Sequence, residues 1–278
     1  MAKKLANPHL RTLENTLSST YGWALTPTFR AMLQEVVSSK AQRLGLDEIT
    51  YCRMAVKSGG ELQSVAEGVI SRETLFFRDP EQYRALHTLV LPALIERRQN
   101  DRKLRLWSAG CSTGEEPFSL AMLVECLLTD RENWRVEILA VELSSKLLME
   151  ANLGRYPHSQ LINVEADFRE RFFSTPPSGT AGLLELDRRV RRNVKFRHAN
   201  LYDAQLWQFL PGQFDLIVCS QVLCQMHHTG VHQTLGRVHQ ALSPHGYFMV
   251  SPAEASLVVS SRLKPARALP AGFFMKAE

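Results

Sequence analysis

Apolar positions in the first part of the chain recur at helical spacing. Leu10, Leu13 and Leu17 form one such stripe. The pair Thr26-Pro27 is typical of a helix start, because a hydroxyl caps the first turn and proline fits its first position. Residues 1–70 are therefore predicted to form an all-helical domain. Two further stripes share the spacing: Phe29, Leu33, Val36 and Val37, then Leu62, Val65, Ala66, Val69 and Ile70.

The pattern changes after residue 103 to short apolar runs that alternate with helical stripes. Such alternation predicts a parallel sheet with helices on both faces. A turn is expected at 243–246, and a closing edge strand at Phe273–Met275. The predicted strands are 104–109, 136–143, 194–199, 214–220 and 247–251, and the helices are 117–128, 145–153 and 231–241.

Two stretches interrupt this organisation. Residues 71–103 combine a segment without helical pattern, 71–80, with an entry helix, and we interpret them as a linker. Residues 157–193 hold a turn-rich loop, a predicted strand at 183–186 and the start of another at Arg189. They are expected to form a small inserted β-subdomain within an α/β domain that spans 104–278.

Composition excludes several classes of protein. The 278 residues are 45% hydrophobic, with five cysteines and neither Cys-x-x-Cys nor a metal-ligand spacing, so no metal is expected. Neither a signal peptide nor a membrane span is evident, which predicts a cytoplasmic protein without membrane insertion. The net charge of +5 is mild, and the basic cluster between Arg188 and His198 lacks the aromatic residues of nucleic-acid sites. Nucleic acid is therefore not an expected partner.

The stretch from Leu104 to Phe118 carries the clearest chemistry. An apolar strand opens into a loop with Gly110 and Gly114, and a helix follows, as in the nucleotide sites of doubly wound sheets. No phosphate-binding motif is present, and Glu115 and Glu116 would repel a phosphate. The loop therefore favours S-adenosylmethionine, although two glycines alone also fit a plain turn.

Polar residues end the next strands of the predicted sheet. Glu142 can accept the hydroxyl hydrogens of a ribose, or it is a solvated strand end. Asn200 can pair with an adenine edge while Leu201 packs on its face. Ser220 and Gln221 reach the same edge of the sheet, which is where ligands bind in open α/β folds.

These residues resemble the CheR-type chemoreceptor glutamate methyltransferases, which depend on S-adenosylmethionine. The resemblance runs from about Tyr21 to about Leu257. It is strongest in Leu106–Leu120, with a second signature in Thr74–Pro80. Supporting pieces lie at 151–156, 200–201, 214–219 and 242–248. The resemblance implies a Rossmann-like α/β methyltransferase domain with an N-terminal helical domain and a small inserted β-subdomain.

The resemblance also implies roles for individual residues. Thr74 and Arg78 would line the cofactor pocket from the linker, Glu116 would hold the methionine amino group, and Glu142 the ribose. The remaining positions share a place at the sheet edge beside the adenine or the methyl group: Gly110, Asn200, Leu201, Gln221 and Val222. Arg78 is the candidate catalytic residue, which would orient the acceptor carboxylate; a linker salt bridge is the alternative.

Several positions depart from the family's pattern. Glu142 replaces an aspartate, and Arg72 replaces an asparagine. The family's Cys-Arg-Asn-Val-Leu-Ile-Tyr-Phe is here Cys219-Ser-Gln-Val-Leu-Cys-Gln-Met226, so that an arginine, an asparagine and a tyrosine are lost. Gln221 can imitate the asparagine, whereas Gln225 cannot imitate the tyrosine ring.

The expected function is methylation of glutamate side chains in the cytoplasmic helical domain of methyl-accepting chemoreceptors, by a monomer that uses S-adenosylmethionine and releases S-adenosylhomocysteine. A glutamate is already ionised at neutral pH, so no general base is required. The departures leave open an alternative in which a degenerate relative binds the cofactor as a sensor or scaffold without turnover.

Overall fold

The computed structural model describes residues 8–70, 73–176, 182–208, 210, 214–259 and 261–276. Two compact units are present. One holds the described part of Met1–Ser71 together with Gln225–Gln233, and the other holds Arg72–Cys224 and Thr234–Glu278. Arg72, at which the family pattern has asparagine, and residues 177–181 of the predicted turn-rich loop lie outside the described residues.

In the smaller unit, three helices begin at side-chain caps. Thr26 accepts a hydrogen bond from the Phe29 amide at 3.1 Å, and Asp47 and Ser58 cap the next two helices in the same way. Its apolar stripes face inward, with Leu13, Leu17 and Leu33 fully buried. The helices are α1 (Pro8–Tyr21), α2 (Pro27–Arg43), α3 (Glu48–Lys57) and α4 (Gly59–Val69).

A segment from far along the chain completes this unit. The Ala24 amide donates to the Gln225 carbonyl at 2.8 Å, and the His227 amide donates to the Gly22 carbonyl at 2.8 Å. Between them Trp23 and Met226 form an antiparallel bridge. Hydrophobic periodicity carries no information about such a long-range pairing, and the sequence did not indicate it.

The larger unit contains a seven-stranded sheet in the order β6-β2-β1-β7-β8-β10-β9. The first five of these strands are parallel, and β10 pairs antiparallel with β8 and β9. The order reverses between β1 and β7, which is the switch point where doubly wound sheets bind ligands. The strands are β1 (Lys103–Ala109), β2 (Arg135–Glu142), β6 (Val194–His198), β7 (Phe214–Val218), β8 (Leu242–Met249), β9 (Leu263–Pro265) and β10 (Phe273–Lys276).

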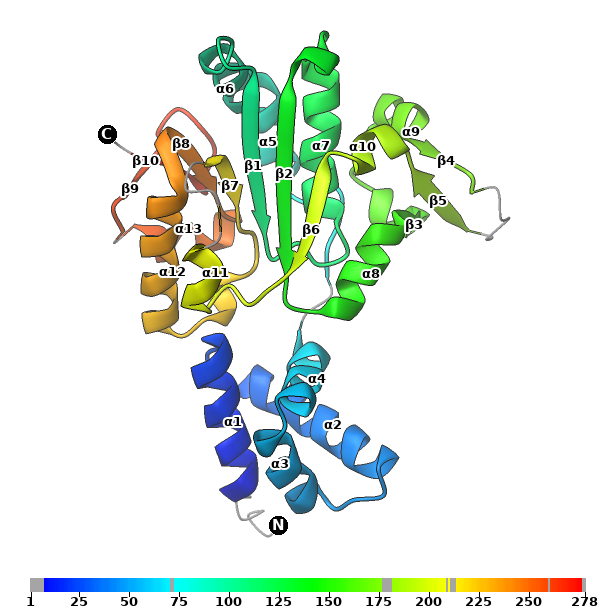
Figure 1. The fold of residues 1–278 in the computed structure, drawn as a ribbon, viewed down its shortest axis with the longest axis vertical. Coiled ribbons are helices and arrows are strands. Elements are labelled where there is room, and N and C mark those ends of the chain that lie inside the picture. Colours follow the sequence, from blue (N-terminus) through cyan, green and yellow to red (C-terminus); the bar gives the residue numbers. More distant parts are fainter. Residues whose placement is uncertain are drawn as a thin grey trace. The chain divides into compact units, whose positions relative to one another are not determined.

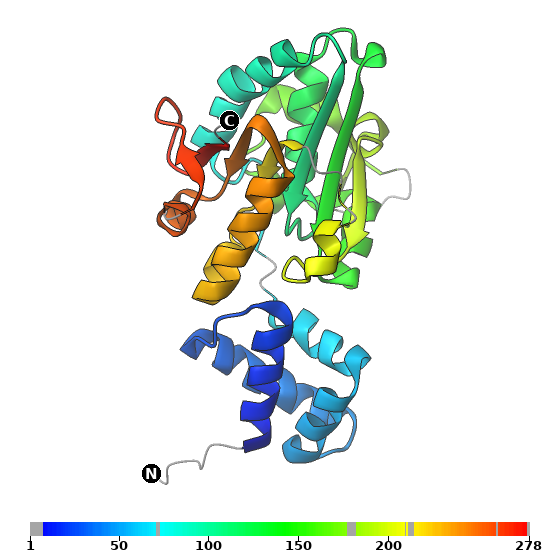
Figure 2. The same ribbon diagram turned by 60° about the vertical axis from the view of Figure 1, so that its left-hand side comes forward.

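Helices cover both faces of this sheet (Figures 1 and 2). Helices α7 (Glu115–Leu127) and α8 (Ser145–Leu153) pack on one face, and α11 (Ala204–Gln208) and the part of α12 (His228–Ala241) from Thr234 onward lie on the other. This arrangement confirms the predicted α/β fold. The remaining helical segments are α5 (Pro80–Ala85), a π-helical turn (Leu86–Val90), α6 (Leu91–Arg97), α13 (Ala255–Val258), and short turns at Arg131–Asn133, His158–Leu161, Leu223–Gln225 and Pro252–Glu254.

The inserted segment forms a second sheet of three antiparallel strands in the order β3-β5-β4. Its elements are β3 (Arg155–Pro157), α9 (Ala166–Phe172), β4 (Phe173–Ser174) and β5 (Leu183–Leu186). The predicted strand at 183–186 is thus confirmed. The strand predicted from Arg189 is wrong, because Asp187 caps the short helix α10 (Arg188–Arg191) there.

Two other details differ from the sequence prediction. Residues 243–246 lie within β8, as an irregularity in its pairing with β7, and do not form a separate turn. Strand β10 is not at the edge of the sheet, because β9 pairs along its outer side. Neither arrangement is encoded in local periodicity. Among the described helices, none combines the length and apolar character that crossing a membrane requires.

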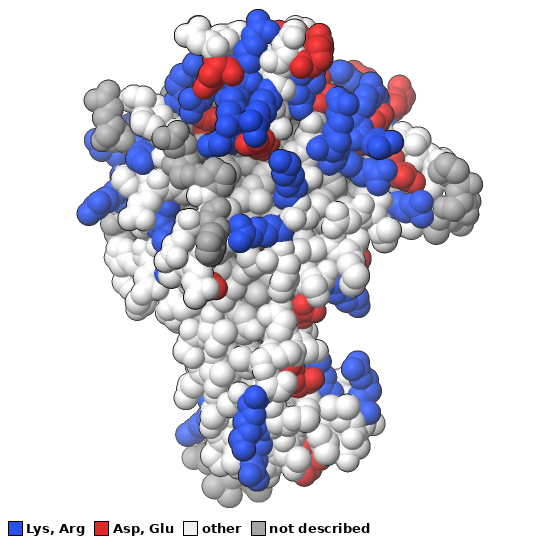
Figure 3. Space-filling model, in the orientation of Figure 1, with Lys and Arg blue, Asp and Glu red and all other residues white. Residues whose placement is uncertain are grey.

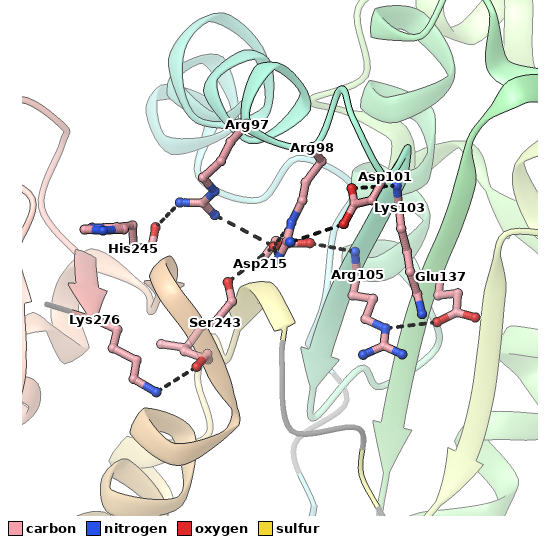
Figure 4. A network of polar contacts seen from close by, with 11 residues as sticks. Arg97, Arg98, Asp101, Lys103, Arg105, Glu137, Asp215, Ser243, His245 and Lys276 are labelled. Carbon is pink, nitrogen blue, oxygen red and sulfur yellow. Dashed lines mark hydrogen bonds and ion pairs between the residues drawn. The ribbon is translucent and has the colours of Figure 1, made fainter. Parts of the chain in front are cut away.

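A buried carboxylate ties the sheet together at the edge where the parallel strands begin. Asp215 is 1% exposed and accepts two hydrogen bonds from Arg98, at 2.7 and 2.9 Å. It also accepts from the Arg105 amide at 2.9 Å and the Ser243 hydroxyl at 3.3 Å, as Figure 4 shows. The contacts join α6, β1, β7 and β8. This network therefore fixes the strand ends opposite the candidate site.

Candidate cofactor site

The loop after β1 is packed closely by its neighbours at both of its glycines. Gly110 and Gly114 have φ of +90° and +97°, which other residues adopt only with strain. The amides of Gly110 and Cys111 donate to the Val141 carbonyl at 2.9 and 3.0 Å, which holds the loop against the end of β2. A Cβ atom at Gly110 would lie 2.4 Å from Cγ2 of Val222. The structure thus brings together two of the predicted residues from either side of the switch point.

Glu142 ends β2 and turns its carboxylate onto this loop. Oε2 accepts from the Ser112 amide at 2.9 Å, and Oε1 accepts from the amides of Leu143 and Ser144 at 2.8 and 2.9 Å. Burial raises the pKa of Glu142 above its ordinary value, and the three amides act in the opposite direction. Because each carboxylate oxygen has two acceptor positions, these three bonds leave one position on Oε2.

Glu116 lies in the first turn of α7 at the opposite side of the loop. Oε1 accepts from the Ser108 hydroxyl at 2.6 Å, and Ser220 supplies further hydrogen bonds. Burial raises the pKa of Glu116 to about 7, against the effect of both serines. A cation beside it would stabilise the ionised form, since opposite charges attract strongly in a partly desolvated site.

Thr74 reaches the same region from the linker. Its side chain hydrogen-bonds Glu115, which is fully buried and also accepts from the Thr113 hydroxyl at 2.8 and 2.9 Å. Burial raises the pKa of Glu115 to about 7. The linker is therefore fastened to the start of α7, one residue before Glu116.

Arg78 follows in the same segment. Its Nη1 atom donates to the Glu73 carbonyl at 2.7 Å, and the preceding Phe77 is held at a φ of +50° with its amide on the Ser119 hydroxyl. The charge of Arg78 acts on the Cys224 thiol, beyond the end of β7. Its role toward an acceptor carboxylate stays a prediction.

Asn200 and Leu201 follow β6 and are linked to Glu142 by the backbone, because the Ala199 amide donates to the Glu142 carbonyl at 3.0 Å. The Asn200 side chain accepts from the Tyr202 amide at 2.9 Å, and Leu201 is 9% exposed. These contacts order the loop after β6. The role of either residue toward an adenine ring stays a prediction.

Glu254 is the residue of this region that sequence reasoning missed. It is 1% exposed and accepts from the amides of Gln221 and Cys224 at 2.7 and 3.0 Å. A signal was present, because Ser251-Pro-Ala-Glu254 has the spacing of a capping box, and that box is formed. The long-range bonds to the turn after β7 are not visible in any local pattern.

The described residues fit a nucleoside that carries positive charge and no phosphate. Gly110 lets Val222 pack directly against the loop backbone, and two carboxylates lie on either side of the loop. The Ser112 hydroxyl between them is buried and has no hydrogen-bond partner within the described parts of the chain. A bound ligand with polar hydrogens would satisfy both Ser112 and the remaining position on Glu142.

The surface charge lies elsewhere. Figure 3 shows Lys and Arg gathered over the end of the larger unit that carries α6 and α10. The basic cluster predicted from the sequence is located on α10 and β6. In Figure 1, this end holds the starts of β1 and β2, whereas Gly110 and Glu142 follow the ends of these strands. The residues of α10 therefore lie away from the site, whereas His198 at the end of β6 pairs in register with Glu142, and its charge acts to lower the pKa of that carboxyl.

The chain is similar to known proteins over most of its length. Residues 72–266 match a family model described as "CheR methyltransferase, SAM binding domain". The "Probable biofilm formation methyltransferase WspC" of Pseudomonas aeruginosa is 32% identical over 91% of this chain, which spans 58% of that protein. A "Chemotaxis protein methyltransferase" of Borreliella burgdorferi is 26% identical, over 90% of this chain and 89% of its own length. "Chemotaxis protein methyltransferase 1" of P. aeruginosa is 31% identical, over 80% and 82%.

Proposed function

Because the chain belongs to the CheR methyltransferase family, whose matched region is an S-adenosylmethionine-binding domain, we propose that it methylates glutamate side chains of chemoreceptor-like proteins. The single observation that supports this most is the placement of Glu116, Glu142 and Gly110 around one loop at the switch point of the sheet. Relatives named as chemotaxis methyltransferases support the choice of acceptor.

The proposed roles in binding follow from the chemistry of each side chain. Glu116 pairs with the ammonium group of the cofactor, and Glu142 accepts a ribose hydroxyl at its remaining position on Oε2. Asn200 and Leu201 bracket the adenine ring. From the remaining sides, the pocket is closed by Thr74, Arg78, Gln221 and Val222.

When bound, the cofactor supplies an electrophilic methyl group on a sulfonium. The task of the protein is then to hold the acceptor carboxylate in line with that group and to exclude water, which contributes roughly 7–11 kcal/mol in well-aligned reactions. The acceptor needs no base, because its pKa is near 4.3 when unperturbed. Arg78, which uses one of its five N–H donors on Glu73, has donors left to orient the acceptor.

The proposed acceptor is the cytoplasmic helical domain of a methyl-accepting chemoreceptor, and the proposed enzyme is a cytoplasmic monomer. The test uses the full chain, radiolabelled S-adenosylmethionine and a receptor cytoplasmic fragment. Base-labile label is expected on the fragment and lost when its acceptor glutamates are replaced by glutamine. Equal labelling of both fragments would refute ester formation at those residues.

The sensor alternative is decided by the same experiment. It requires cofactor binding without turnover on any receptor fragment. Ser220, which replaces the family's arginine, hydrogen-bonds Glu116 and so supports cofactor binding, which both alternatives require. Sustained wild-type turnover would exclude a sensor without activity.

A further inference from the structure

The turn that follows β7, residues 220–224, forms one wall of the candidate site. Ser220 hydrogen-bonds Glu116, and Val222 lies against Gly110. The turn thus contacts both residues that define the pocket on the side of β1. Its shape decides whether Glu116 keeps its serine partner and how Val222 packs against Gly110.

This turn is not in a relaxed conformation. Gln221 has a backbone φ of +62°, a conformation that residues other than glycine, asparagine and aspartate rarely adopt. Such a residue persists only where surrounding contacts impose its conformation. The sequence of the turn therefore does not by itself specify its shape.

The contacts that impose it converge on one buried carboxylate. Oε2 of Glu254 accepts from the Gln221 amide at 2.7 Å, and Oε1 accepts from the Cys224 amide at 3.0 Å. The Ser251 hydroxyl and amide donate to Oε2 at 2.8 and 3.3 Å, which anchors the carboxylate to the end of β8. One side chain thus holds both ends of the turn.

We infer that Glu254 is a positioning residue, which holds the turn 220–224 in the shape that binds the cofactor. The inference rests on the cofactor-binding part of the proposed function and is independent of the methyl acceptor. Glu254 acts through Gln221 and Cys224, and no direct contact with substrate is assigned to it.

Glu254 has a second effect, through its charge. It raises the pKa of Glu116, because a second carboxylate nearby disfavours ionisation of the first. A protonated Glu116 cannot pair with an ammonium group, so the affinity for the cofactor should fall as the pH drops through the Glu116 transition. Loss of the Glu254 charge should move that fall to lower pH.

Two substitutions separate the reach of Glu254 from its charge. Glu254→Asp keeps the charge and shortens the side chain, so that it no longer spans both amides. Glu254→Gln keeps the side-chain length and removes the charge. It also places the NH2 group of glutamine, a donor, against a backbone N–H that needs an acceptor. The matched control is Asp215→Asn, because Asp215 is equally buried and multiply bonded but lies at the other end of the sheet.

The measurement is calorimetric titration of each full-length variant with S-adenosylhomocysteine between pH 6 and 9, with thermal unfolding as a check of folding. We expect both Glu254 variants to bind at least tenfold more weakly at pH 8.5. Only Glu254→Gln should move the acidic fall in affinity to lower pH. Asp215→Asn should lose thermal stability and keep the wild-type affinity and midpoint.

Wild-type affinity in both folded Glu254 variants would overturn the inference. An equal loss of affinity in Asp215→Asn would also overturn it, because Glu254 would then have only a general stabilising role. If Glu254→Gln does not fold, Glu254→Asp against Asp215→Asn decides the question. Failure of the wild-type chain to bind would instead refute the proposed function. Methylation of a receptor fragment is not a readout here, so the two failures remain distinct.

Discussion

Gly110 and Val222 face each other across the switch point of the sheet, so closely that a single methyl group does not fit between them. A Cβ atom built at Gly110 would lie only 2.4 Å from Cγ2 of Val222. Gly110 follows β1 and Val222 follows β7, so their contact joins the two loops at the candidate site. Hydrogen bonds from Gly110 to Val141 and from Gln221 to Glu254 hold the two sides in place.

Substitution of Gly110 should therefore damage the site. Gly110→Ala combines a φ of +90° with this overlap, and we expect about 2–4 kcal/mol of lost stability together with loss of cofactor binding. Chemical denaturation and calorimetry measure the two effects. Gly236→Ala is the control, because nothing lies within 4 Å of its Cβ position in α12 and alanine favours a helix. Tight binding by Gly110→Ala would contradict this geometry of the pocket.

Cofactor affinity should depend on pH near neutrality. The pKa of Glu116 is raised to about 7 by burial, and the proposed pairing with the ammonium group of the cofactor would lower it. Binding below pH 7 then requires loss of a proton, so affinity should be constant above the transition and fall up to tenfold per pH unit below it. Titrations in buffers of different ionisation enthalpy measure this proton release.

The same carboxylate should be required at high pH. Glu116→Gln removes the proposed charge partner of the ammonium group and should weaken binding by one to two orders of magnitude, in line with about 1.5–3 kcal/mol for a charged hydrogen bond. Glu125→Gln is a matched control, because Glu125 is near the other end of α7 and pairs with Arg131 at 2.9 Å. An unchanged affinity and an unchanged pH profile in Glu116→Gln would remove Glu116 from the site.

Glu115 should make stability depend on pH in a predictable direction. Burial raises its pKa in the folded protein to about 7, above that of the unfolded chain, so its ionisation destabilises the fold as the pH rises from about 4.5 through 7. Glu115→Gln removes this penalty. The difference in melting temperature, variant minus wild type, should be more positive at pH 8 than at pH 5. A difference that does not change with pH would show that Glu115 is not the group responsible.

The Asp215 network should matter for stability alone. Asp215→Asn leaves Arg98 without its buried carboxylate partner, a change that typically costs about 3–5 kcal/mol. Equilibrium unfolding in urea measures the loss. Arg189→Gln tests an exposed pair, with Asp187, and should cost less than about 1 kcal/mol. Comparable losses in the two variants would contradict the difference in burial.

Local signals in the sequence were sufficient for the elements that carry the loop. Helix α8 begins and ends where predicted, because Ser144 caps its start and Gly154 follows its end at a φ of +61°. Strand β1 and the glycine loop were equally clear. The helix α10 was taken for a strand because four residues are too few for periodicity, and its Asp187 cap went unrecognised.

Information about the site was lost where contacts join distant segments. The placement of Glu116 and Glu142 beside the glycine loop could be predicted, because one residue follows the loop and the other ends a strand. The bonds from Gln221 and Cys224 to Glu254 span about thirty residues, and no spacing rule indicates them. The pairing of β9 with the outer side of β10 could likewise not be predicted, because the order of strands is set by packing of the whole sheet.

The return of Gln225–Gln233 to the N-terminal helices bears on how this protein can be dissected. A fragment that starts after Ser71 would retain Met226 and His227 but lack Trp23 and Gly22, their partners. A fragment that ends at Ser71 would lack residues Gln225–Gln233, which belong to the same unit. Truncation at the obvious boundary thus yields two incomplete halves, and loss of activity in either would say nothing about which half performs the chemistry.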